Sequence, residues 1–466
     1  MNLRQTMHTE QQLKALYKQA QGYAFEYADG VAERPVFPSQ QAMADLEQFV
    51  ETLPSNRGDA GSILQQLHQY GSPASVAQTG GRYFGFVNGG ALPVTLATKW
   101  LTDFWDQNTA LHAMSPITSK LEEICECWLQ QLLGLPDTTA AGFVSGTSSA
   151  IFCSLAAARW RLYASQGWDF NAQGHNGAPP IRIIAGRHTH GAVIKAIALL
   201  GFGLDNIEWV EGDDQGRILA ADMPELDSSC IVLLQAGNVN SGAFDPFEDI
   251  CAKANAAGAW VHIDGAFGLW AAGTEQLKYL CQGIEQAQSW SVDGHKTLNT
   301  PYDSGILLCA DREALVTALQ ASGAYLTQSF GEQRDGMLYT PEMSRRARAV
   351  ELWAALKYLG KCGVDELVYG LHRCAVQFAE ELTAAGFRIL NDVVFNQVIV
   401  APSEDDQVTQ LILEHIQASG ECWVGSSLWQ GQKVIRVSVC SWVTSEQDIS
   451  RSVAAFMAAR EAICAK

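Results

Sequence analysis

A lysine that directly follows an apolar run is the first residue whose position suggests chemistry. Lys296 lies in the stretch Asp293-Gly294-His295-Lys296, between apolar runs at 287–292 and 305–309. We expect both runs to be strands, with Lys296 in the turn that joins them. An amine beside buried strands is desolvated and has a lowered pKa, which suits it to forming a Schiff base. A solvated surface lysine in a loop is the alternative interpretation.

Asp264 holds a similar position at the end of another apolar run, 259–264. If this run is a buried strand, it carries the carboxylate to the edge of an α/β sheet where ligands bind. A buried carboxylate needs a cationic or hydrogen-bonding partner, which the protonated nitrogen of a pyridine ring supplies; a capping or turn aspartate is the alternative. Gly265 and Ala266 are small enough for a flat ring to lie against the backbone. A lysine and an aspartate at the ends of two strands are the pair that pyridoxal phosphate requires, because the lysine forms the imine and the aspartate keeps the ring an electron sink.

Small residues before a long apolar helix predict a phosphate site. Gly146, Thr147 and Ser148 precede a helix expected at about 149–164. Free N–H groups and the positive end of the helix dipole attract phosphate at such a terminus. An ordinary serine cap is the commoner structure, so this motif gains its weight from the lysine and the aspartate.

Two histidines, His188 and His190, follow a strand expected at 181–186. They could ligate a metal, but no acidic residue or cysteine lies at a telling spacing, so we expect no metal here. A histidine stacked on a flat cofactor is the better interpretation. A further apolar run, 231–237, leads into a polar turn that contains Asn240. Four candidate sites at strand ends are a stronger indication than any one motif.

Strands that alternate with helices predict an α/β fold. Each strand is apolar on both faces, which indicates a mostly parallel sheet covered by helices. We divide the chain into an N-terminal helical segment (1–80), a large domain (81–364) and a small C-terminal α+β domain (365–466). The polar stretch 322–343 has no clear period and is expected to be a lid or a disordered excursion. A helix is expected to open at Ser344 and to reach Leu359 and Gly360.

Composition excludes several classes of partner. With 466 residues, of which 47% are apolar, the chain can bury a large core. A net charge of −19 argues against nucleic acid or an anionic membrane as partner. No uncharged apolar run is long enough to span a bilayer and the N-terminus is polar, so we expect a cytoplasmic protein. The 12 cysteines are scattered, as buried thiols in a reducing compartment would be.

From about Arg82 to its end, the chain resembles the group II pyridoxal-phosphate-dependent decarboxylases, which include the aromatic-L-amino-acid, glutamate, tyrosine and histidine enzymes. The most specific matches are Asp-Gly-His-Lys at 293–296 with Pro-Tyr-Asp-Ser-Gly at 301–305, and His-Ile-Asp-Gly-Ala at 262–266. The resemblance implies the fold type I architecture of pyridoxal-phosphate-dependent transferases and pyridoxal 5′-phosphate as cofactor. It also implies a homodimer whose active sites form at the subunit interface.

The resemblance assigns roles by position. Lys296 is similar to the lysine that forms the imine, and Asp264 to the partner of the pyridine nitrogen. The other matching positions are the ring contacts Ala266 and His190, the phosphate turn Gly146, Thr147 and Ser148, the histidine near the phosphate, His295, and Asn240, in the turn that contacts the ring hydroxyl or the substrate.

Three features depart from the family pattern. Ser149-Ala150-Ile151 stands where the family usually has Glu-Ala-Asn, and Thr297 stands where tryptophan is common. In the aromatic decarboxylases a lid tyrosine supplies a proton to the reacting carbon; the loop here is shorter, and Tyr339 aligns with it approximately. Relatives that lack this tyrosine can instead perform oxidative deamination to aldehydes.

The leading hypothesis is therefore α-decarboxylation of an L-amino acid. Another fold type I reaction, such as aldehyde synthase, carbon–carbon lyase or aminotransferase chemistry, is the first alternative. The second is a non-catalytic relative that acts as a scaffold, against which the intact Lys296, Asp264 and His190 count. Replacing Lys296 by alanine separates them, because an enzyme would lose turnover and a scaffold would keep its function.

The substrate side chain is indicated by an aromatic, glycine-rich stretch at 82–90. Tyr83, Phe84 and Phe86, together with Trp105, favour a pocket for an aromatic or apolar side chain, although the same residues could be core. No arginine stands out in the sequence as the partner of a second substrate carboxylate.

Overall fold

A seven-stranded sheet forms the centre of the larger part of the chain. The computed structural model describes residues 2–320 and 333–464. The strands follow the order β1-β7-β6-β5-β4-β2-β3, and β7 runs antiparallel to both of its neighbours. The mostly parallel sheet that the sequence predicts is confirmed. Its strands are β1 (Ala140–Val144), β2 (Arg182–Gly186), β3 (Ile207–Val210), β4 (Cys230–Gln235), β5 (Trp260–Asp264), β6 (Ser289–Asp293) and β7 (Gly305–Cys309).

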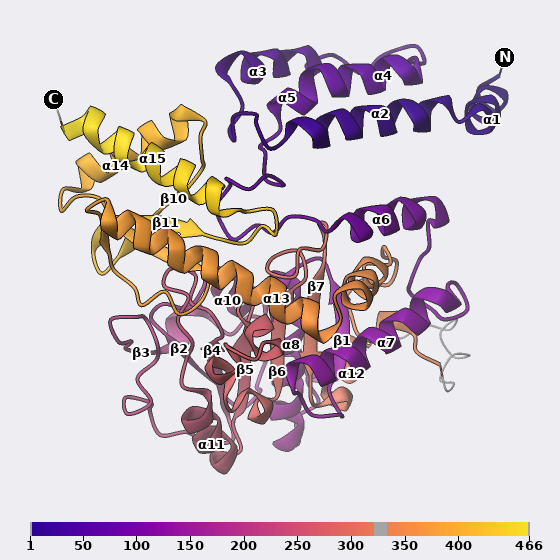
Figure 1. The fold of residues 1–466 in the computed structure, drawn as a ribbon. Helices are drawn as coiled ribbons and strands as arrows, with labels where there is room; N and C mark the ends of the chain where they lie inside the picture. The colour runs from indigo at the N-terminus through magenta and orange to yellow at the C-terminus, as the bar shows by residue number, and fades with distance from the viewer. Residues whose placement is uncertain (1, 321–332, 465–466) are drawn as a thin grey trace.

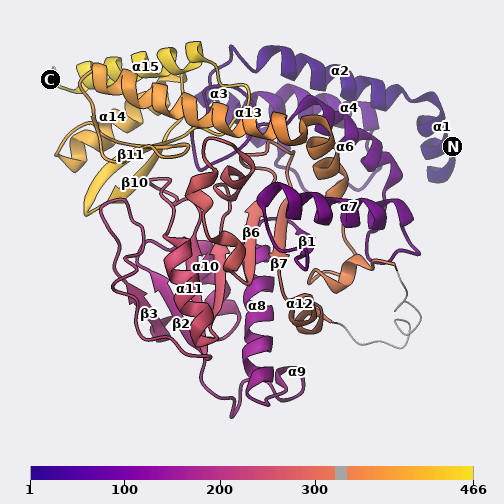
Figure 2. The same cartoon turned by 60° about the horizontal axis from the view of Figure 1, so that its bottom comes forward.

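Helices cover both faces of this sheet (Figure 1 and Figure 2). All residues of β4 are buried, and successive side chains enter opposite cores: Ile231 and Leu233 enter one, Val232 and Leu234 the other. The first core is closed by α8, α10 and α12, and the second by α7, α11 and α13. The helices of this part are α7 (Pro116–Leu133), α8 (Thr147–Ser165), α9 (Phe170–Gln173), α10 (Gly191–Leu199), α11 (Phe247–Ala257), α12 (Arg312–Leu319) and α13 (Ala349–Ala384).

A second, antiparallel sheet of order β10-β11-β9-β8 lies in the C-terminal part. Figure 1 shows α13 running from the large sheet towards this smaller one. The element is kinked at Gly360, whose backbone angles (φ 58°, ψ −170°) are not helical, so two helical segments meet there, close to residue 364, where we divide the chain. The domain boundaries stay a prediction. The remaining elements are β8 (Arg388–Ile389), β9 (Gln397–Ala401), α14 (Asp406–Ser419), β10 (Gly425–Trp429), β11 (Gln432–Ser438) and α15 (Glu446–Cys464).

The helix expected to open at Ser344 begins five residues later, at Ala349. Residues 344–348 are held instead by side-chain contacts. Arg346 lies 2.6 Å from Glu351 and 3.0 Å from Asp303, and Arg345 lies 2.8 Å from Glu122. Glu122 and Asp303 belong to segments far away in the sequence, so helical propensity alone could not predict where this helix begins.

The N-terminal helices form a layer apart from the large sheet (Figure 1). Neither α1 nor α2 buries a residue, and α2 contacts α6 through Tyr17 on Phe104 and Phe25 on Trp100, with ring centroids 4.9 and 5.9 Å apart. Among the described residues, no helix is long and apolar enough to cross a bilayer. The helices are α1 (Leu3–Leu13), α2 (Ala15–Gly30), α3 (Gln40–Ala44), α4 (Ala60–Gln66), α5 (Ser72–Ala74) and α6 (Pro93–Trp105).

The stretch predicted as a lid, 322–343, lies partly outside the described residues, which exclude 321–332. Its described part is anchored to the large sheet. The buried Arg334 lies 2.6 Å from Glu126 and 3.3 Å from Glu122, and a short 3-10 turn follows at Gly336–Leu338.

Candidate active site

Lys296 lies in the turn that follows β6, as the sequence predicts. Its Nζ is 3.0 Å from Oδ2 of Asp293, the last residue of the strand. Gly89 crosses this turn, and its backbone N–H donates to the carbonyl of His295 over 3.3 Å. A Cβ on Gly89 would collide with the carbonyl oxygen of Lys296, so this close approach requires glycine. The lysine is thereby held at the edge of the sheet, with 20% of its side chain exposed.

Asp293 ties the lysine turn to the start of α8. Its Oδ1 accepts from the Thr147 backbone N–H over 2.8 Å, and its Oδ2 accepts from the Thr147 hydroxyl over 2.9 Å. The carboxylate is buried, and the His295 Nε2 lies 3.5 Å from Oδ2. The sequence indicates Asp293 only as part of the motif at 293–296. An acidic residue that ends a buried strand, as Asp264 does, was the available signal.

Gly146, Thr147 and Ser148 lie where β7 and the lysine turn meet the first turn of α8. Gly305 opens β7 so close to Gly146 that any Cβ on Gly305 would collide with the Gly146 backbone. The positive end of the helix dipole faces this junction and favours an anion there, so the predicted phosphate contacts stay a prediction.

His295 lies between the lysine turn and the start of α8. Its Nδ1 accepts from the Ser304 backbone N–H over 3.0 Å, so the neutral ring carries its proton on Nε2, toward Asp293. Burial lowers the pKa of His295, and the charge of Asp293 acts in the opposite direction. The ring of Tyr302 stacks on it at 4.3 Å.

Asp264 ends β5, the strand beside β6, as predicted. Its Oδ1 accepts from the Ala266 backbone N–H over 3.1 Å and from the Ser291 hydroxyl over 3.4 Å. Desolvation raises the pKa of Asp264, while the charges of His190 and Lys296 lower it. No ion pair reaches Asp264 from the described residues, so this buried carboxylate lacks a bound cation.

Two other predicted residues belong to the surroundings of Asp264. Ala266 bridges the two strand ends, because its N–H donates to Asp264 and its carbonyl accepts from the Asp293 N–H over 2.9 Å. His190 caps α10, with its Nδ1 accepting from the Ala192 N–H over 3.2 Å, so the neutral ring carries its proton on Nε2. The ring is exposed, and its charge acts on Asp264.

Asn240 points toward the C-terminal sheet in the isolated chain. Its Oδ1 accepts from the Ser427 hydroxyl of β10 over 2.6 Å, and its N–H donates to Asn238 over 2.9 Å. The described contacts of Asn240 therefore join the two sheets and include none with Lys296 or Asp264.

The structure does not bring Tyr339 to this group. Its ring is 9% exposed and lies in the core on the α8 face of the sheet. Its hydroxyl accepts from Arg312 over 2.8 Å, and the Arg334 guanidinium lies 4.0 Å above the ring centroid. These contacts hold the tyrosine beside the ion pairs of Glu126.

Arg436 is a candidate that the sequence did not reveal. It lies on β11, and its Nη1 donates to the carbonyl of Val239 over 3.0 Å. Its Nε is buried with no hydrogen-bond partner, and the described residues give it no acidic partner. Desolvation lowers the pKa of Arg436, and its charge acts on His190. A guanidinium in this state is suited to receive a carboxylate.

The aromatic residues expected to line a pocket divide into two sets. Phe84 is fully buried in the C-terminal core, and Tyr83 is 5% exposed. Phe86 is 64% exposed and has a left-handed backbone with φ 59°, which is strained for a residue with a side chain. Its ring stacks on Trp423 at 5.4 Å. Phe86 thus presents an exposed apolar ring three residues before Gly89, which contacts the lysine turn.

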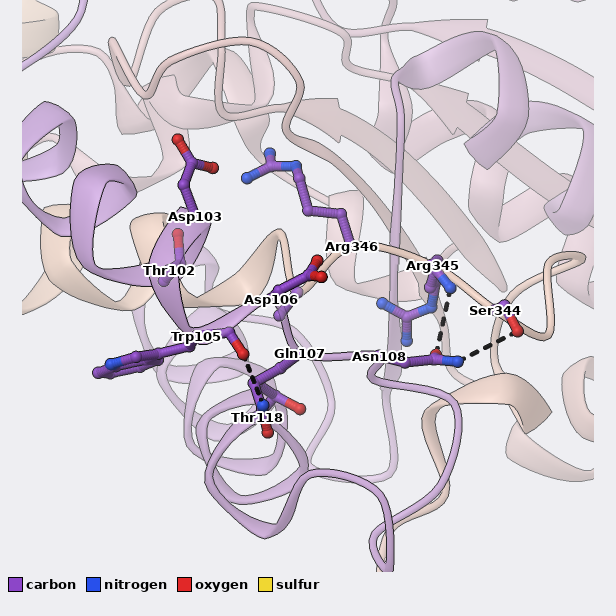
Figure 3. A pocket seen from close by; sticks show the side chains of 11 residues that line it. Thr102, Asp103, Trp105, Asp106, Gln107, Asn108, Thr118, Ser344, Arg345 and Arg346 are labelled. Carbon is purple, nitrogen blue, oxygen red and sulfur yellow. Dashed lines mark hydrogen bonds between the residues drawn. The ribbon is translucent and has the colours of Figure 1, made fainter. Parts of the chain in front are cut away.

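Trp105 borders a different pocket, of about 510 Å³, between the end of α6 and residues 344–347 (Figure 3). Nine of its eleven lining residues are polar or charged, among them Asp106, Asn108 and Arg346. No residue predicted for the cofactor site lines it. Trp105 is therefore assigned to this pocket and not to the surroundings of Lys296.

The residues at the ends of β5 and β6 fit pyridoxal phosphate. The buried Asp264 lacks a cation, which a protonated pyridine nitrogen would supply. The start of α8 suits a phosphate, and Lys296 provides a primary amine. The hydroxyl of Thr189, beside His190, is buried without a partner, as expected beside a missing polar ligand.

Comparison with known proteins agrees with this geometry. Tyrosine decarboxylase of Papaver somniferum is 25% identical over 468 residues, which cover 91% of this chain and 90% of its own. Phenylacetaldehyde synthase of a Rosa hybrid cultivar is 25% identical over 370 residues, 72% of this chain and 71% of its own. The crystal structure of Oryza sativa TDC with PLP and tryptamine superposes with a TM-score of 0.89 at 20% identity and covers 97% of this chain and 98% of its own. The family model of the pyridoxal-dependent decarboxylase conserved domain matches residues 46–400, and the chain therefore belongs to that family.

Proposed function

We propose that this chain catalyses the α-decarboxylation of an L-amino acid to the corresponding amine and carbon dioxide. The observation that carries the proposal is the pairing of Lys296 and Asp264 at the ends of the neighbouring parallel strands β6 and β5, close enough for the lysine charge to act on the carboxylate. Pyridoxal phosphate, the cofactor of the family, supplies an electron sink for the pair of electrons that the departing carbon dioxide leaves behind.

In this proposal the residues of the chain position the cofactor. Lys296 holds it covalently, Asp264 keeps a proton on the ring nitrogen, and the α8 terminus at Gly146, Thr147 and Ser148 binds the phosphate. Ala266 and His190 flank the ring, His295 lies by the phosphate, and Asn240 stays a predicted contact of the ring hydroxyl or the substrate.

Arg436 is proposed to orient a carboxylate of the substrate. Its support is the unpaired Nε and its electrostatic influence on His190. The exposed ring of Phe86, stacked on Trp423, favours an aromatic or apolar side chain. We therefore propose an aromatic L-amino acid as substrate, with Arg436 reaching its single carboxylate.

Decarboxylation coupled to oxidation, which yields an aldehyde, is the second candidate. The position of Tyr339 favours it, because its hydroxyl is bonded to Arg312 and makes no described contact with Lys296 or His190. In a decarboxylase, His190, whose neutral ring carries its proton on Nε2, is then the candidate donor.

A mass-balance assay distinguishes these functions. The cofactor-loaded protein is offered the twenty common L-amino acids in air, and carbon dioxide, amine, aldehyde, ammonia and hydrogen peroxide are measured. Decarboxylation predicts carbon dioxide and amine in equal amounts, whereas the oxidative reaction consumes dioxygen and water and predicts carbon dioxide, aldehyde, ammonia and peroxide in equal amounts. Bound cofactor with no product from any of these amino acids would contradict both.

A homodimer is proposed as the working form. Its support is the set of large apolar side chains that α1, α2 and α6 leave exposed: Leu3, Met7, Leu13, Tyr17, Phe25, Leu96, Trp100, Leu101, Phe104 and Trp105. Exposed apolar side chains in this number are typical of a protein–protein interface, and a second copy of the chain would bury them. Light scattering tests this, with Leu101→Asp expected to give monomers and Leu428→Asp, at an exposed leucine of β10, expected to leave the dimer intact. A cytoplasmic location stays a prediction.

A further inference from the structure

Asp293 engages donors of the turn at which we propose that the cofactor phosphate binds. Both of its oxygens are engaged by Thr147, through the backbone N–H at 2.8 Å and the hydroxyl at 2.9 Å. Thr147 is the first residue of α8, and α8 has 19 residues, so these donors belong to the positive end of a long helix. The cofactor-free chain therefore supplies its own anion to the helix end.

The same carboxylate also holds the amine that the cofactor needs. Oδ2 of Asp293 is 3.0 Å from Lys296 Nζ, and the Asp293 side chain is 2% exposed. The Asp293 carboxylate thus contacts both groups that the cofactor needs: the Thr147 donors for its phosphate and the Lys296 amine for its aldehyde. A phosphate group carries a charge of about −1.5 to −2 near neutral pH, so it would also be repelled by Asp293.

We propose that Asp293 acts as a built-in competitor of the cofactor phosphate, stabilising the cofactor-free chain and making the cofactor exchangeable. This inference rests on the proposed phosphate-binding turn at Gly146, Thr147 and Ser148. Loading the cofactor moves Lys296 from an ion pair to a covalent bond and places phosphate beside the carboxylate. Because a ligand shifts an equilibrium only by its differential affinity for two states, the competing anion lowers the apparent affinity for the cofactor.

The neighbouring charges do not cancel this repulsion. Lys296 loses its positive charge to the cofactor bond if that bond is unprotonated, and His295 has its pKa lowered by burial, which favours its neutral form. No arginine is ion-paired with Asp293 among the residues that the structure describes.

The test compares pyridoxal phosphate with pyridoxal, which has the same aldehyde and no phosphate. Equilibrium binding to the full-length protein is followed by the absorbance of the imine for the wild type, Asp293→Asn and Asp293→Ser. We expect Asp293→Asn to raise the ratio of the two affinities in favour of pyridoxal phosphate by at least about tenfold, because only the phosphate is relieved of a like charge. Any effect of freeing Lys296 falls on both ligands and leaves the ratio unchanged.

A second readout uses inorganic phosphate on the cofactor-free protein. Phosphate should raise the melting temperature of Asp293→Asn more than it raises that of the wild type. The control is Asp137→Asn, at an exposed aspartate, and phosphate should raise its melting temperature no more than it raises that of the wild type. Circular dichroism confirms that each variant is folded, and Asp293→Ser serves if the asparagine variant is not.

Two results would overturn the inference. If the ratio of the two affinities is the same in Asp293→Asn as in the wild type, Asp293 has no effect on the phosphate. If the ratio shifts in favour of pyridoxal in Asp293→Asn, Asp293 helps to bind the phosphate. Failure of the wild type to form an imine with either aldehyde is a different result: it would refute the proposed function itself.

Discussion

Asp264 and Asp293 end neighbouring strands of one sheet, yet their surroundings are opposite. Asp293 accepts two hydrogen bonds from Thr147 and pairs with Lys296, so its charge is satisfied within the chain. Asp264 receives a backbone N–H and one hydroxyl, and desolvation raises its pKa. A carboxylate that is ion-paired within the chain stabilises the fold, whereas a buried carboxylate with hydrogen bonds but no ion pair among the described residues favours a cationic ligand. The same residue type at the same structural position therefore serves structure in one case and function in the other.

Replacing Asp264 by asparagine should give the largest loss of activity. The amide cannot hold a proton on the ring nitrogen, so we expect amine formation to fall by at least about 100-fold. The product is measured by chromatography under saturating cofactor. Activity within a few-fold of the wild type would mean that Asp264 is as structural as Asp293.

Arg436→Met should have the next largest effect. Losing a charge-assisted hydrogen bond to a carboxylate costs about 1.5–3 kcal/mol, which corresponds to a fall in kcat/KM of about 10- to 100-fold. Arg436→Lys should recover part of it. Arg388→Met is the matched control, because Arg388 lies in the same sheet and pairs with Glu404 on the surface. Equal losses in the two methionine variants would remove Arg436 from the site.

The free energy of unfolding should fall more when Asp293 is replaced than when Asp264 is replaced, the reverse of the order expected for activity. Asp293→Ala leaves the buried donors of Thr147 unpaired, so the free energy of unfolding of the cofactor-free protein should fall by about 1–3 kcal/mol. Asp264→Asn keeps its backbone partner and should not be destabilised. Urea titration measures both, and a greater loss in Asp264→Asn than in Asp293→Ala would reverse our assignment of their roles.

The pH dependence of the same titration sharpens this contrast. The pKa of Asp264 is raised from 3.8 in the native state, so the native protein retains a proton that the unfolded chain has lost. Its contribution to the free energy of unfolding is fully present below pH 3.8 and is lost as the pH rises through the native pKa. Asp264→Asn should remove this part of the slope, and a slope identical to that of the wild type would contradict the raised pKa.

The positions of Lys296 and Asp264 could be predicted because both follow from local pattern: each apolar run ends in a polar residue at a strand end. Arg436 could not be found from a local pattern, because its described contact is with Val239, 197 residues earlier in the chain. The sequence of β11 does not indicate that this strand of the smaller sheet faces a loop of the larger sheet. The helix start at Ala349 and the surroundings of Tyr339 could not be predicted for a similar reason. Both regions are held by contacts with segments far away in the sequence: Arg345 pairs with Glu122, and the Tyr339 hydroxyl accepts from Arg312, which pairs with Glu126.

Tyr339→Phe should have the smallest effect. Its hydroxyl bonds Arg312 away from the site, so amine formation should change far less than the roughly 100-fold that removal of a catalytic acid costs. Stability should fall by about 1 kcal/mol through the lost hydrogen bond. A switch of products from amine to aldehyde in this variant would instead make Tyr339 the proton donor.

The most direct test of the account is to find where the cofactor attaches. The protein is loaded with pyridoxal phosphate, reduced with borohydride and digested, and the modified peptide is identified by mass spectrometry, with Lys296→Ala as the control. We predict one phosphopyridoxyl group per chain, on Lys296, and none in the control. Stoichiometric labelling of another lysine, or of the alanine variant, would contradict the site that we place at the ends of β5 and β6.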